Sequence, residues 1–333
     1  MRKISIIISS LLLMLITFTK VNSDEKFSSW IIEFKKKAIN EGISEKTVDA
    51  VMNNAIFLPK VIEYDRYQPE FYEDTKTYVS KRTSKDKVKK GKRIYKKNKN
   101  LINIVDKEFK VEKELLLALM GIETNYGTYL GKMDIISSLA TLSYDKRRSE
   151  FFSNELITIL KLIDQNKVDK DILFGSWAGA FGNFQFMPTT ISNYAIDYNN
   201  NSIIELKEAE DSFASAANYL NKIGWKKNEP CFFKIELKEN TPKKFLNTSA
   251  KKLKNKRKFK DLKKYIKSNE KINFRENSLV AIITPDKDII PNSNNLNPAF
   301  LVSSNYEQIL KWNRSLRFAL AVCTLKDKIK DEI

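Results

Sequence analysis

The stretch Gly121-Ile122-Glu123-Thr124-Asn125-Tyr126-Gly127 sets the interpretation of the whole chain. It follows the apolar run Leu115–Met120, and the apolar residues here recur at helical spacing. Gly127 is typical of the residue that ends a helix, so we predict a helix from about Val111 to Tyr126. This helix would place one carboxylate, Glu123, where an apolar helix meets a glycine turn.

An acid at this position suits proton transfer. Apolar neighbours and limited water disfavour the charged form of a carboxylate, which raises its pKa and lets it hold a proton near neutral pH. A solvated glutamate in a last helical turn is the alternative. Glycine placement favours the functional interpretation, because six of the nine glycines lie between positions 121 and 182. Scarce glycine is used where the backbone turns or approaches another group closely.

The chain begins with a segment typical of secreted proteins. Met1-Arg2-Lys3 precedes an apolar run from Ile4 to Phe18, and Val21-Asn22-Ser23 forms a Val-x-Ser processing pattern. The run is shorter than the roughly 20 residues of a membrane-spanning helix, so an uncleaved anchor is the weaker alternative. No cysteine follows it, which excludes lipid attachment there. We expect residues 1–23 to be a signal peptide and the mature, soluble protein to work outside the cytoplasm.

Charge and cysteine content narrow the function. The net charge is +18, and twelve Lys or Arg against one acid occur in each of two stretches, Lys76–Asn100 and Lys243–Lys267. Such blocks are solvated faces or mobile arms, and they attract anionic wall polymers or lipid headgroups; no nucleic-acid motif is visible. The chain has no His, which excludes zinc and His-activated nucleophiles. Cys231 and Cys323 form either one disulfide or two buried thiols.

Hydrophobic periodicity predicts a mainly helical chain with a few short strands after Pro230. The last helix is predicted over Ser315–Leu325. We divide the chain into a signal peptide (1–23), an N-terminal helical region with the first basic stretch (24–100), a helical core (101–226), a basic insertion with short strands (227–300) and a C-terminal segment (301–333).

A second glycine-rich window, Gly175–Pro188, combines small residues with aromatic and amide side chains. Trp177 and Phe184 offer flat faces, and Ser176 and Gln185 offer neutral hydrogen bonds. This mixture suits a sugar, which stacks on aromatic rings and carries many hydroxyl groups. A tight loop with an aromatic core is the alternative.

Together these motifs resemble the lytic murein transglycosylase B family. The resemblance runs from about Trp30 to Leu325 and rests on the Glu123 stretch, Ser138–Tyr144, Arg147-Arg148, Phe151-Phe152, the Gly175–Pro188 window, Ala217-Asn218-Tyr219 and Gly224-Trp225. It implies a mainly α, lysozyme-like α+β fold with a small antiparallel sheet.

The resemblance also implies a periplasmic enzyme that cleaves the bond between N-acetylmuramic acid and N-acetylglucosamine in peptidoglycan without water. Most glycosidases use two carboxylates, whereas this window offers only Glu123. Glu123 would act as the single acid and base, and the product would carry a 1,6-anhydro end. Asp134, Asp145 or Glu150 would restore hydrolysis if one of them faced Glu123. No cofactor is required, and the implied partners are glycan strands and other cell-wall enzymes.

The family's substrate contacts carry over to matching positions. Ser176 would hydrogen-bond near the acid or the N-acetyl group, and Arg148 would meet an acidic lactyl or peptide group. Trp312 stands where a tyrosine is expected, so stacking is retained and a hydroxyl contact is not. The full predicted set is Ser176, Gln185, Tyr219, Asn313, Trp312, Arg148 and Tyr126.

A calcium loop is the last feature that the resemblance implies, with an Asn-rich turn as the alternative. The oxygen-bearing residues stand at loop positions 1, 3, 5, 9 and 12, but Ser202 occupies position 6, where the turn favours glycine. The predicted ligands are Asp197, Asn199, Asn201, Glu205 and Glu208.

Two other functions stay open. A non-catalytic peptidoglycan-binding scaffold would keep the fold without turnover, and a basic membrane-surface protein would rest on charge alone. The intact set of Glu123, Ser176, Gln185 and Asn313 favours the enzyme.

Overall fold

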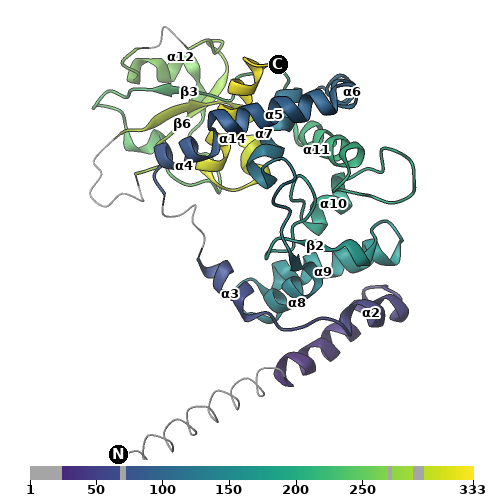
Figure 1. The fold of residues 1–333 in the computed structure, drawn as a ribbon. Helices are drawn as coiled ribbons and strands as arrows, with labels where there is room; N and C mark the ends of the chain where they lie inside the picture. The colour runs from purple at the N-terminus through teal and green to yellow at the C-terminus, as the bar shows by residue number, and fades with distance from the viewer. Residues whose placement is uncertain (1–24, 68–72, 269–271, 288–295) are drawn as a thin grey trace, which may run out of the picture. The chain divides into compact units, whose positions relative to one another are not determined.

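The computed structural model describes residues 25–67, 73–268, 272–287 and 296–333 (Figure 1). The predicted signal peptide lies outside them. None of the helices in the described part of the chain has both the length and the apolar composition needed to cross a bilayer. The chain forms two compact units, each built from separate stretches; the first takes Met1–Tyr67, Gly131–Phe181 and Phe186–Asn193, and the second takes the remainder. The boundaries at 100, 226 and 300 follow chain order and remain a proposal.

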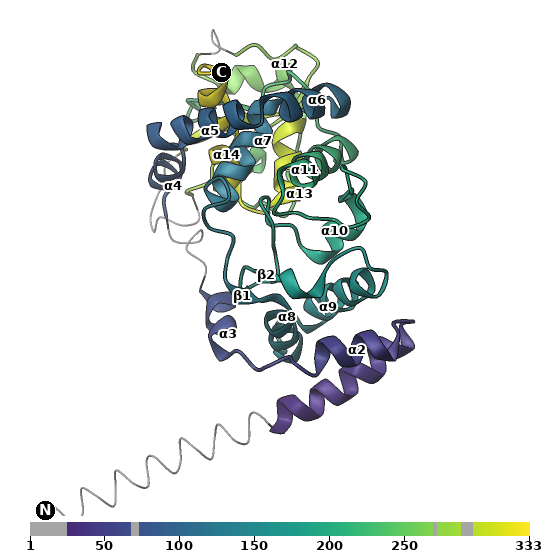
Figure 2. The same ribbon diagram turned by 45° about the vertical axis from the view of Figure 1, so that its right-hand side comes forward.

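The first unit is a group of helices with one short antiparallel ribbon. Helices α8 and α9 pack side by side (Figure 2). Asp134 begins α8 because its carboxylate accepts a hydrogen bond from Ser137 N at 2.6 Å. The elements are a helix over 25–40, α2 (Glu45–Met52), α3 (Pro59–Arg66), β1 (Met133–Asp134), α8 (Ile135–Tyr144), α9 (Ser149–Asp164), η2 (Lys170–Ile172), β2 (Phe174–Gly175) and α10 (Pro188–Tyr194).

The second unit is centred on α7 (Lys113–Thr124), which packs against α14 (Leu316–Lys330) (Figure 1). Residues 115–119 of α7 are completely buried, as expected for a helix that is apolar on all sides. The helix ends two residues earlier than predicted, because Asn125 and Tyr126 adopt left-handed backbone conformations. The surrounding helices are α4 (Thr75–Arg82), α5 (Lys85–Lys97), α6 (Lys99–Phe109), α11 (Ala209–Ile223) and α13 (Ser304–Trp312).

A small sheet with its own apolar core completes the second unit. Strands β3, β7 and β6 are antiparallel, with Leu301 opposite both Phe233 and Ile282, and β4 adds one parallel strand beside β6. Phe259 and Leu262 from α12 pack on this core. The bounds are β3 (Phe232–Ile235), η3 (Lys243–Phe245), β4 (Leu246–Asn247), β5 (Arg257–Lys258), α12 (Phe259–Leu262), η4 (Lys263–Tyr265), β6 (Leu279–Ile283) and β7 (Ala299–Val302).

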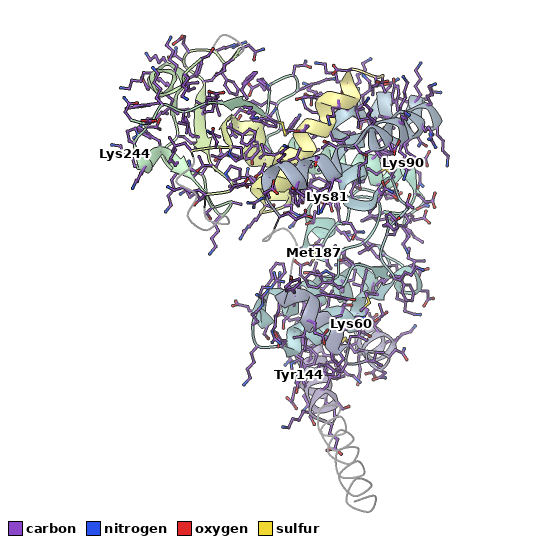
Figure 3. All side chains as sticks on the ribbon, turned by 60° about the vertical axis from the view of Figure 1, so that its left-hand side comes forward. Lys60, Lys81, Lys90, Tyr144, Met187 and Lys244 are labelled. Atoms are coloured by element: carbon purple, nitrogen blue, oxygen red, sulfur yellow. A yellow bond between two sulfur atoms is a disulfide. The ribbon has the colours of Figure 1, made fainter. Side chains whose placement is uncertain are left out.

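The two basic stretches are solvated faces of these elements. The first forms α4, α5 and the start of α6, whereas the second spans η3 to η4. Figure 3 shows Lys81 and Lys90 on the helices and Lys244 near the sheet, so the stretches occupy separate places on the second unit.

Two covalent or charged links join α14 to the rest of the second unit. Cys323 on α14 forms a disulfide with Cys231, directly before β3. Of the two alternatives that the sequence left open, the structure therefore has the disulfide and not two separate thiols. Arg317 on α14 donates to the carboxylate of Asp286 at 2.9 Å, and Thr75 N donates to the same carboxylate at 3.0 Å. Asp286 therefore joins α14 to the first residue of α4.

Tyr126 fills a slot between α5 and α7. A Cβ added at Gly91 or Gly121 would lie 2.6 or 2.7 Å from atoms of its phenol, so only glycine fits at these two positions. The Tyr126 hydroxyl is buried and has no hydrogen-bond partner. The packing role of Tyr126 is observed, whereas its predicted substrate contact stays a prediction.

Replacing Tyr126 with Phe is expected to stabilise the protein. Removing a buried hydroxyl that has no partner recovers its desolvation cost, about 1 kcal/mol in the free energy of unfolding. Burial raises the pKa of Tyr126 above its usual 10. Above pH 10 the unfolded chain ionises this tyrosine while the folded state keeps it neutral, so the wild type loses stability there and the advantage of Tyr126→Phe should grow.

Urea denaturation at pH 7 and pH 10.5 tests this expectation. Tyr306→Phe is the matched control, because its equally buried hydroxyl donates to Leu316 O at 2.6 Å. That variant should lose about 1 kcal/mol at pH 7. A destabilised Tyr126→Phe would contradict the assigned slot.

Removing the disulfide is expected to lower stability. Cys231 and Cys323 are separated by 92 residues, and closing so long a loop restricts the unfolded chain. The double variant Cys231→Ala/Cys323→Ala should lose about 2–4 kcal/mol in the free energy of unfolding. Denaturation of the wild type with and without reductant provides the comparison, and equal midpoints would show that the link does not stabilise the fold.

Candidate active site

Glu123 lies in the last turn of α7 and is half-buried. Its Oε1 accepts a hydrogen bond of 2.9 Å from the indole Nε1 of Trp312, the last residue of α13. The two residues are 189 positions apart in the chain. The end of α13 therefore contacts the side chain of Glu123.

The end of α7 is fixed by hydrogen bonds on either side of Glu123. Thr124 Oγ1 donates to Asn183 O at 2.9 Å, and Gly127 N donates to Thr124 Oγ1 at 3.0 Å. Lys87 Nζ on α5 donates to Gly121 O. Burial lowers the pKa of Lys87 to about 8. Sequence reasoning did not single out Lys87, because nothing in a lysine-rich stretch distinguishes a side chain that turns inward.

Three aromatic rings are stacked behind the acid. Trp312 stacks on Tyr219 with 5.0 Å between ring centroids, and Tyr219 stacks on Tyr194 at 4.4 Å. Phe184 meets the Trp312 ring edge-on at 6.3 Å. Stacked aromatic pairs at these distances add stability beyond the area they bury. The stack therefore restricts the position from which the Trp312 indole donates.

Tyr219 supports the site through its ring and its hydroxyl. The hydroxyl donates to Lys311 O at 3.2 Å, directly before Trp312. Burial raises the pKa of Tyr219 to about 12, so the hydroxyl stays neutral. Its predicted sugar contact stays a prediction, whereas its support of Trp312 is observed. Tyr194, the third ring, was missed because its partners are distant in sequence.

Gln185 and Asn313 belong to the same unit as Glu123. Gln185 adopts a left-handed conformation and donates from Nε2 to Gly182 O at 3.0 Å. It follows Asn183 and Phe184, which contact Thr124 and Trp312. Asn313 directly follows Trp312 and is half-buried. Both residues are thus adjacent in sequence to groups that contact the end of α7 or its tryptophan.

Ser176 and Arg148 belong to the first unit and have local partners there. Ser176 Oγ accepts a hydrogen bond from Ala180 N at 3.1 Å and so shapes its own loop. Arg148 forms an ion pair with the buried Asp65. Burial alone would raise the pKa of Asp65, but hydrogen bonds from Arg147 and Arg148 hold it below its usual value. Arg148 thus shares the single charge of Asp65 with Arg147, and its predicted contact with an acidic substrate group stays a prediction.

The acids that would restore ordinary hydrolysis also have local roles. Asp134 caps α8, and Asp145 pairs with Arg66 at 2.8 Å. Glu150 is exposed in the first turn of α9. In the second unit, structural hydrogen bonds likewise engage the buried carboxylates Asp106, Glu112, Asp211 and Asp286.

The predicted calcium loop is held by its own hydrogen bonds. The carboxylate of Asp197 accepts from Asn201 N at 3.1 Å and from Ser202 N at 2.7 Å, and Asn201 Nδ2 donates to Glu205 at 2.7 Å. Ser202 has a φ of 77° where glycine would be unstrained. The Asn-rich turn is therefore formed with serine at this position.

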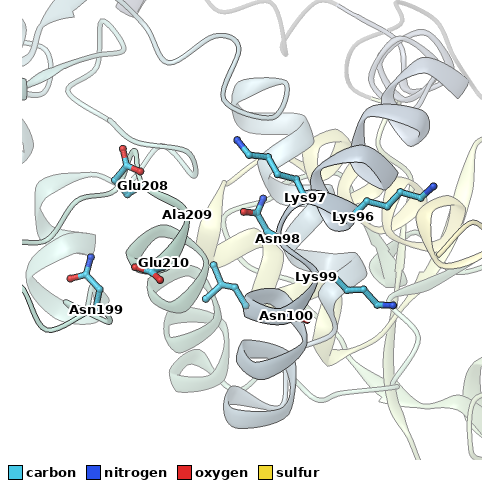
Figure 4. A pocket seen from close by; sticks show the side chains of 10 residues that line it. Lys96, Lys97, Asn98, Lys99, Asn100, Asn199, Glu208, Ala209 and Glu210 are labelled. Carbon is cyan, nitrogen blue, oxygen red and sulfur yellow. The ribbon is translucent and has the colours of Figure 1, made fainter.

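Part of the surroundings of this loop is basic. Asn199 and Glu208 line a pocket of about 560 Å³ together with Lys97, whereas the Lys96 and Lys99 side chains extend away from them (Figure 4). Lysine ammonium groups oppose the binding of a cation. Over the described ranges, no group of three acidic, His or Cys side chains is placed to hold a metal. Calcium binding therefore remains a prediction from resemblance.

Comparison with known proteins identifies a family and a relative that match this chain. A family described as the transglycosylase SLT domain matches residues 26–327. The membrane-bound lytic murein transglycosylase B of Escherichia coli (strain K12) is 35% identical over 153 residues, which are 46% of this chain and 42% of that protein. The alignment thus spans less than half the length of this relative.

Solved structures match over most of the chain. SltB3 from Pseudomonas aeruginosa, in complex with NAG-NAM-pentapeptide, has a TM-score of 0.80 and 30% identity, covering 91% of this chain and 79% of that chain. The Escherichia coli lytic transglycosylase Slt35, in complex with calcium, has a TM-score of 0.73 and 25% identity, covering 90% and 92%. The predicted mainly α, lysozyme-like fold is confirmed. With a match from residue 26 to 327, the chain belongs to the transglycosylase SLT domain family, as its resemblance to lytic murein transglycosylase B predicted.

Proposed function

We propose that this protein is a peptidoglycan lytic transglycosylase with Glu123 as its single acid and base. It cleaves the β-1,4 bond between N-acetylmuramic acid and N-acetylglucosamine and leaves a 1,6-anhydro end. Family membership supports the enzyme class. SltB3, which shares the fold, binds a pentapeptide-bearing NAG-NAM fragment, so we propose a peptide-bearing glycan strand as the substrate.

The observation that carries this proposal is the hydrogen bond from Trp312 to Glu123. An indole N–H can only donate, so Oε1 acts as an acceptor whether the carboxyl group is protonated or not. The same contact therefore suits a residue that gives a proton and later takes one back. This arrangement favours Oε2 as the atom that carries the proton.

The reaction then proceeds in two steps. Glu123 protonates the glycosidic oxygen, the bond from C1 to that oxygen breaks, and the carbonyl oxygen of the muramyl N-acetyl group stabilises C1. Glu123, now a carboxylate, takes the proton of the C6 hydroxyl while O6 bonds to C1. The 1,6-anhydro ring closes, the N-acetyl group is released, and Glu123 regains its proton. No water is consumed, so no second carboxylate is needed to activate one.

The location and partners follow from the same proposal. The pattern of residues 1–23 supports export to the periplasm, where peptidoglycan is the accessible polymer. The exposed basic faces support weak attraction to anionic wall polymers or lipid headgroups. Other cell-wall enzymes are proposed as partners.

Replacing Glu123 with Gln should abolish cleavage. The amide cannot give or take the proton, so we expect a loss of at least about 100-fold in kcat, in line with the loss of general acid–base catalysis. To check this, the protein spanning residues 24 to 333 is incubated with purified peptidoglycan and the products are identified by mass spectrometry. Wild type should release anhydro-ended fragments, and Glu123→Gln should not.

Two results would oppose the proposal. Reducing-end products would identify a hydrolase with a positioned water. Absence of products from the wild type, with peptidoglycan binding retained, would instead identify a scaffold that has the fold and lacks turnover.

Replacing Trp312 with Phe should lower turnover while keeping an aromatic ring on Tyr219. Loss of one hydrogen bond to a charged group, about 1.5–3 kcal/mol, corresponds to a decrease of roughly 10- to 100-fold in kcat/KM. Trp225→Phe is the matched control, because Trp225 Nε1 donates to the buried carboxylate of Glu112 at 2.5 Å. That variant should lose stability and keep the kcat of its folded fraction. Equal kinetic effects from both variants would remove the assigned role of Trp312.

A further inference from the structure

A cationic pocket of about 430 Å³ lies against α13, the helix that ends at Trp312. One wall comes from residues 250–256 of the basic insertion, and the other comes from α13 and the segment after it. The pocket belongs entirely to the second unit, which also contains Glu123. Its volume is in the range of sites that enclose a small ligand.

The lining of this pocket attracts anions. It contains five cations, and its one acid, Glu307, is neutralised by Lys256 at 2.8 Å. Lys251, Lys252 and Arg314 are exposed and form no ion pair within the described ranges. Cations gathered in a concave site raise the local concentration of an anionic ligand. Arg314 adds the planar fork that binds a carboxylate through two parallel hydrogen bonds.

The pocket is close to the acid along the chain. Lys311 and Arg314 line it, and Trp312, between them, donates to Glu123. Residues two apart have Cα atoms no more than roughly 7 Å apart. Arg314 therefore lies on the segment that directly follows the tryptophan holding the acid.

We propose that this pocket binds the carboxylates of the peptide carried by the muramyl sugar, and so makes the enzyme prefer peptide-bearing strands. The inference rests on the proposed function. A tethered peptide fits better than a free phosphate polymer, because the pocket is bounded and adjoins the residue that holds the acid. Sequence resemblance gave an anion-binding role to Arg148, but Arg148 is paired with Asp65. Arg314 has no such partner among the described residues and takes that role here.

The test compares two substrates. Wild type and the triple variant Lys251→Gln/Lys252→Gln/Arg314→Gln are assayed on peptidoglycan strands and on the same strands after an amidase has removed the peptides. We expect the variant to lose about 10-fold in kcat/KM on peptide-bearing strands, in line with the loss of one charged hydrogen bond. Its kcat/KM on peptide-free strands should stay within about twofold of wild type.

A matched control separates the pocket from general attraction to an anionic wall. Lys85→Gln/Lys89→Gln/Arg93→Gln removes the same three charges from the exposed face of α5, outside the pocket. It should leave the preference between the two substrates unchanged. An equal loss of preference in this control would show that net charge alone is responsible and would overturn the pocket.

A binding measurement keeps the inference testable without turnover. Calorimetric titration with the free peptidoglycan pentapeptide should show affinity for wild type, about 10-fold weaker affinity for the triple variant, and loss of binding when the peptide carboxyls are amidated. If wild type cleaves neither substrate but binds the peptide in this manner, the proposed function fails and the pocket stands. If wild type cleaves both substrates and the triple variant keeps its preference, the pocket is overturned. Preferential binding of poly(glycerol phosphate) over the peptide also overturns it.

Discussion

The hydrogen bond between Trp312 and Glu123 is the contact on which the rest of the site depends. It joins the central buried helix α7 to a helix near the end of the chain. A carboxylate at a helix end can occupy several rotamers, and ordering it costs conformational entropy. This entropy is lost on folding and not on substrate binding, because the stacked rings of Tyr194, Tyr219 and Trp312 restrict the donor before substrate arrives.

A second set of contacts fixes the backbone that carries the acid. Tyr126 occupies a slot that only glycine at positions 91 and 121 can form, and Lys87 donates to the carbonyl of Gly121. A lysine ammonium group at the C-terminal end of a helix also interacts favourably with the negative end of the helix dipole. The partly buried ammonium and the buried tyrosine hydroxyl are each unfavourable in isolation. Their presence at the same helix end indicates that the position of the Glu123 backbone is fixed by contacts that lower the free energy of unfolding.

Sequence reasoning succeeded where the information is local. Periodicity predicted α7 to within two residues at each end, because consecutive apolar turns indicate a buried helix. It left the predicted substrate contacts of Tyr126 and Arg148 without support, since a motif gives a residue's place in the chain but not the partner that already holds it. The partners were Gly91 and Asp65, both distant in sequence. The same reason hid Lys87 and Tyr194, whose roles exist only after folding. The disulfide was left open because spacing alone cannot bring two cysteines together.

The proposed one-acid chemistry explains why the site is built for rigidity more than for charge. A hydrolase divides proton transfer and water activation between two carboxylates, so each needs only one protonation state. Glu123 alone must present the same oxygen to the leaving group and then to the C6 hydroxyl. A charged partner such as arginine would favour the carboxylate and oppose the acid step, since an opposite charge lowers the pKa of a carboxyl group. The neutral indole of Trp312 orients the group with less bias between its two forms. An aromatic stack ending in a donor without charge is therefore a more suitable support for this acid than an ion pair.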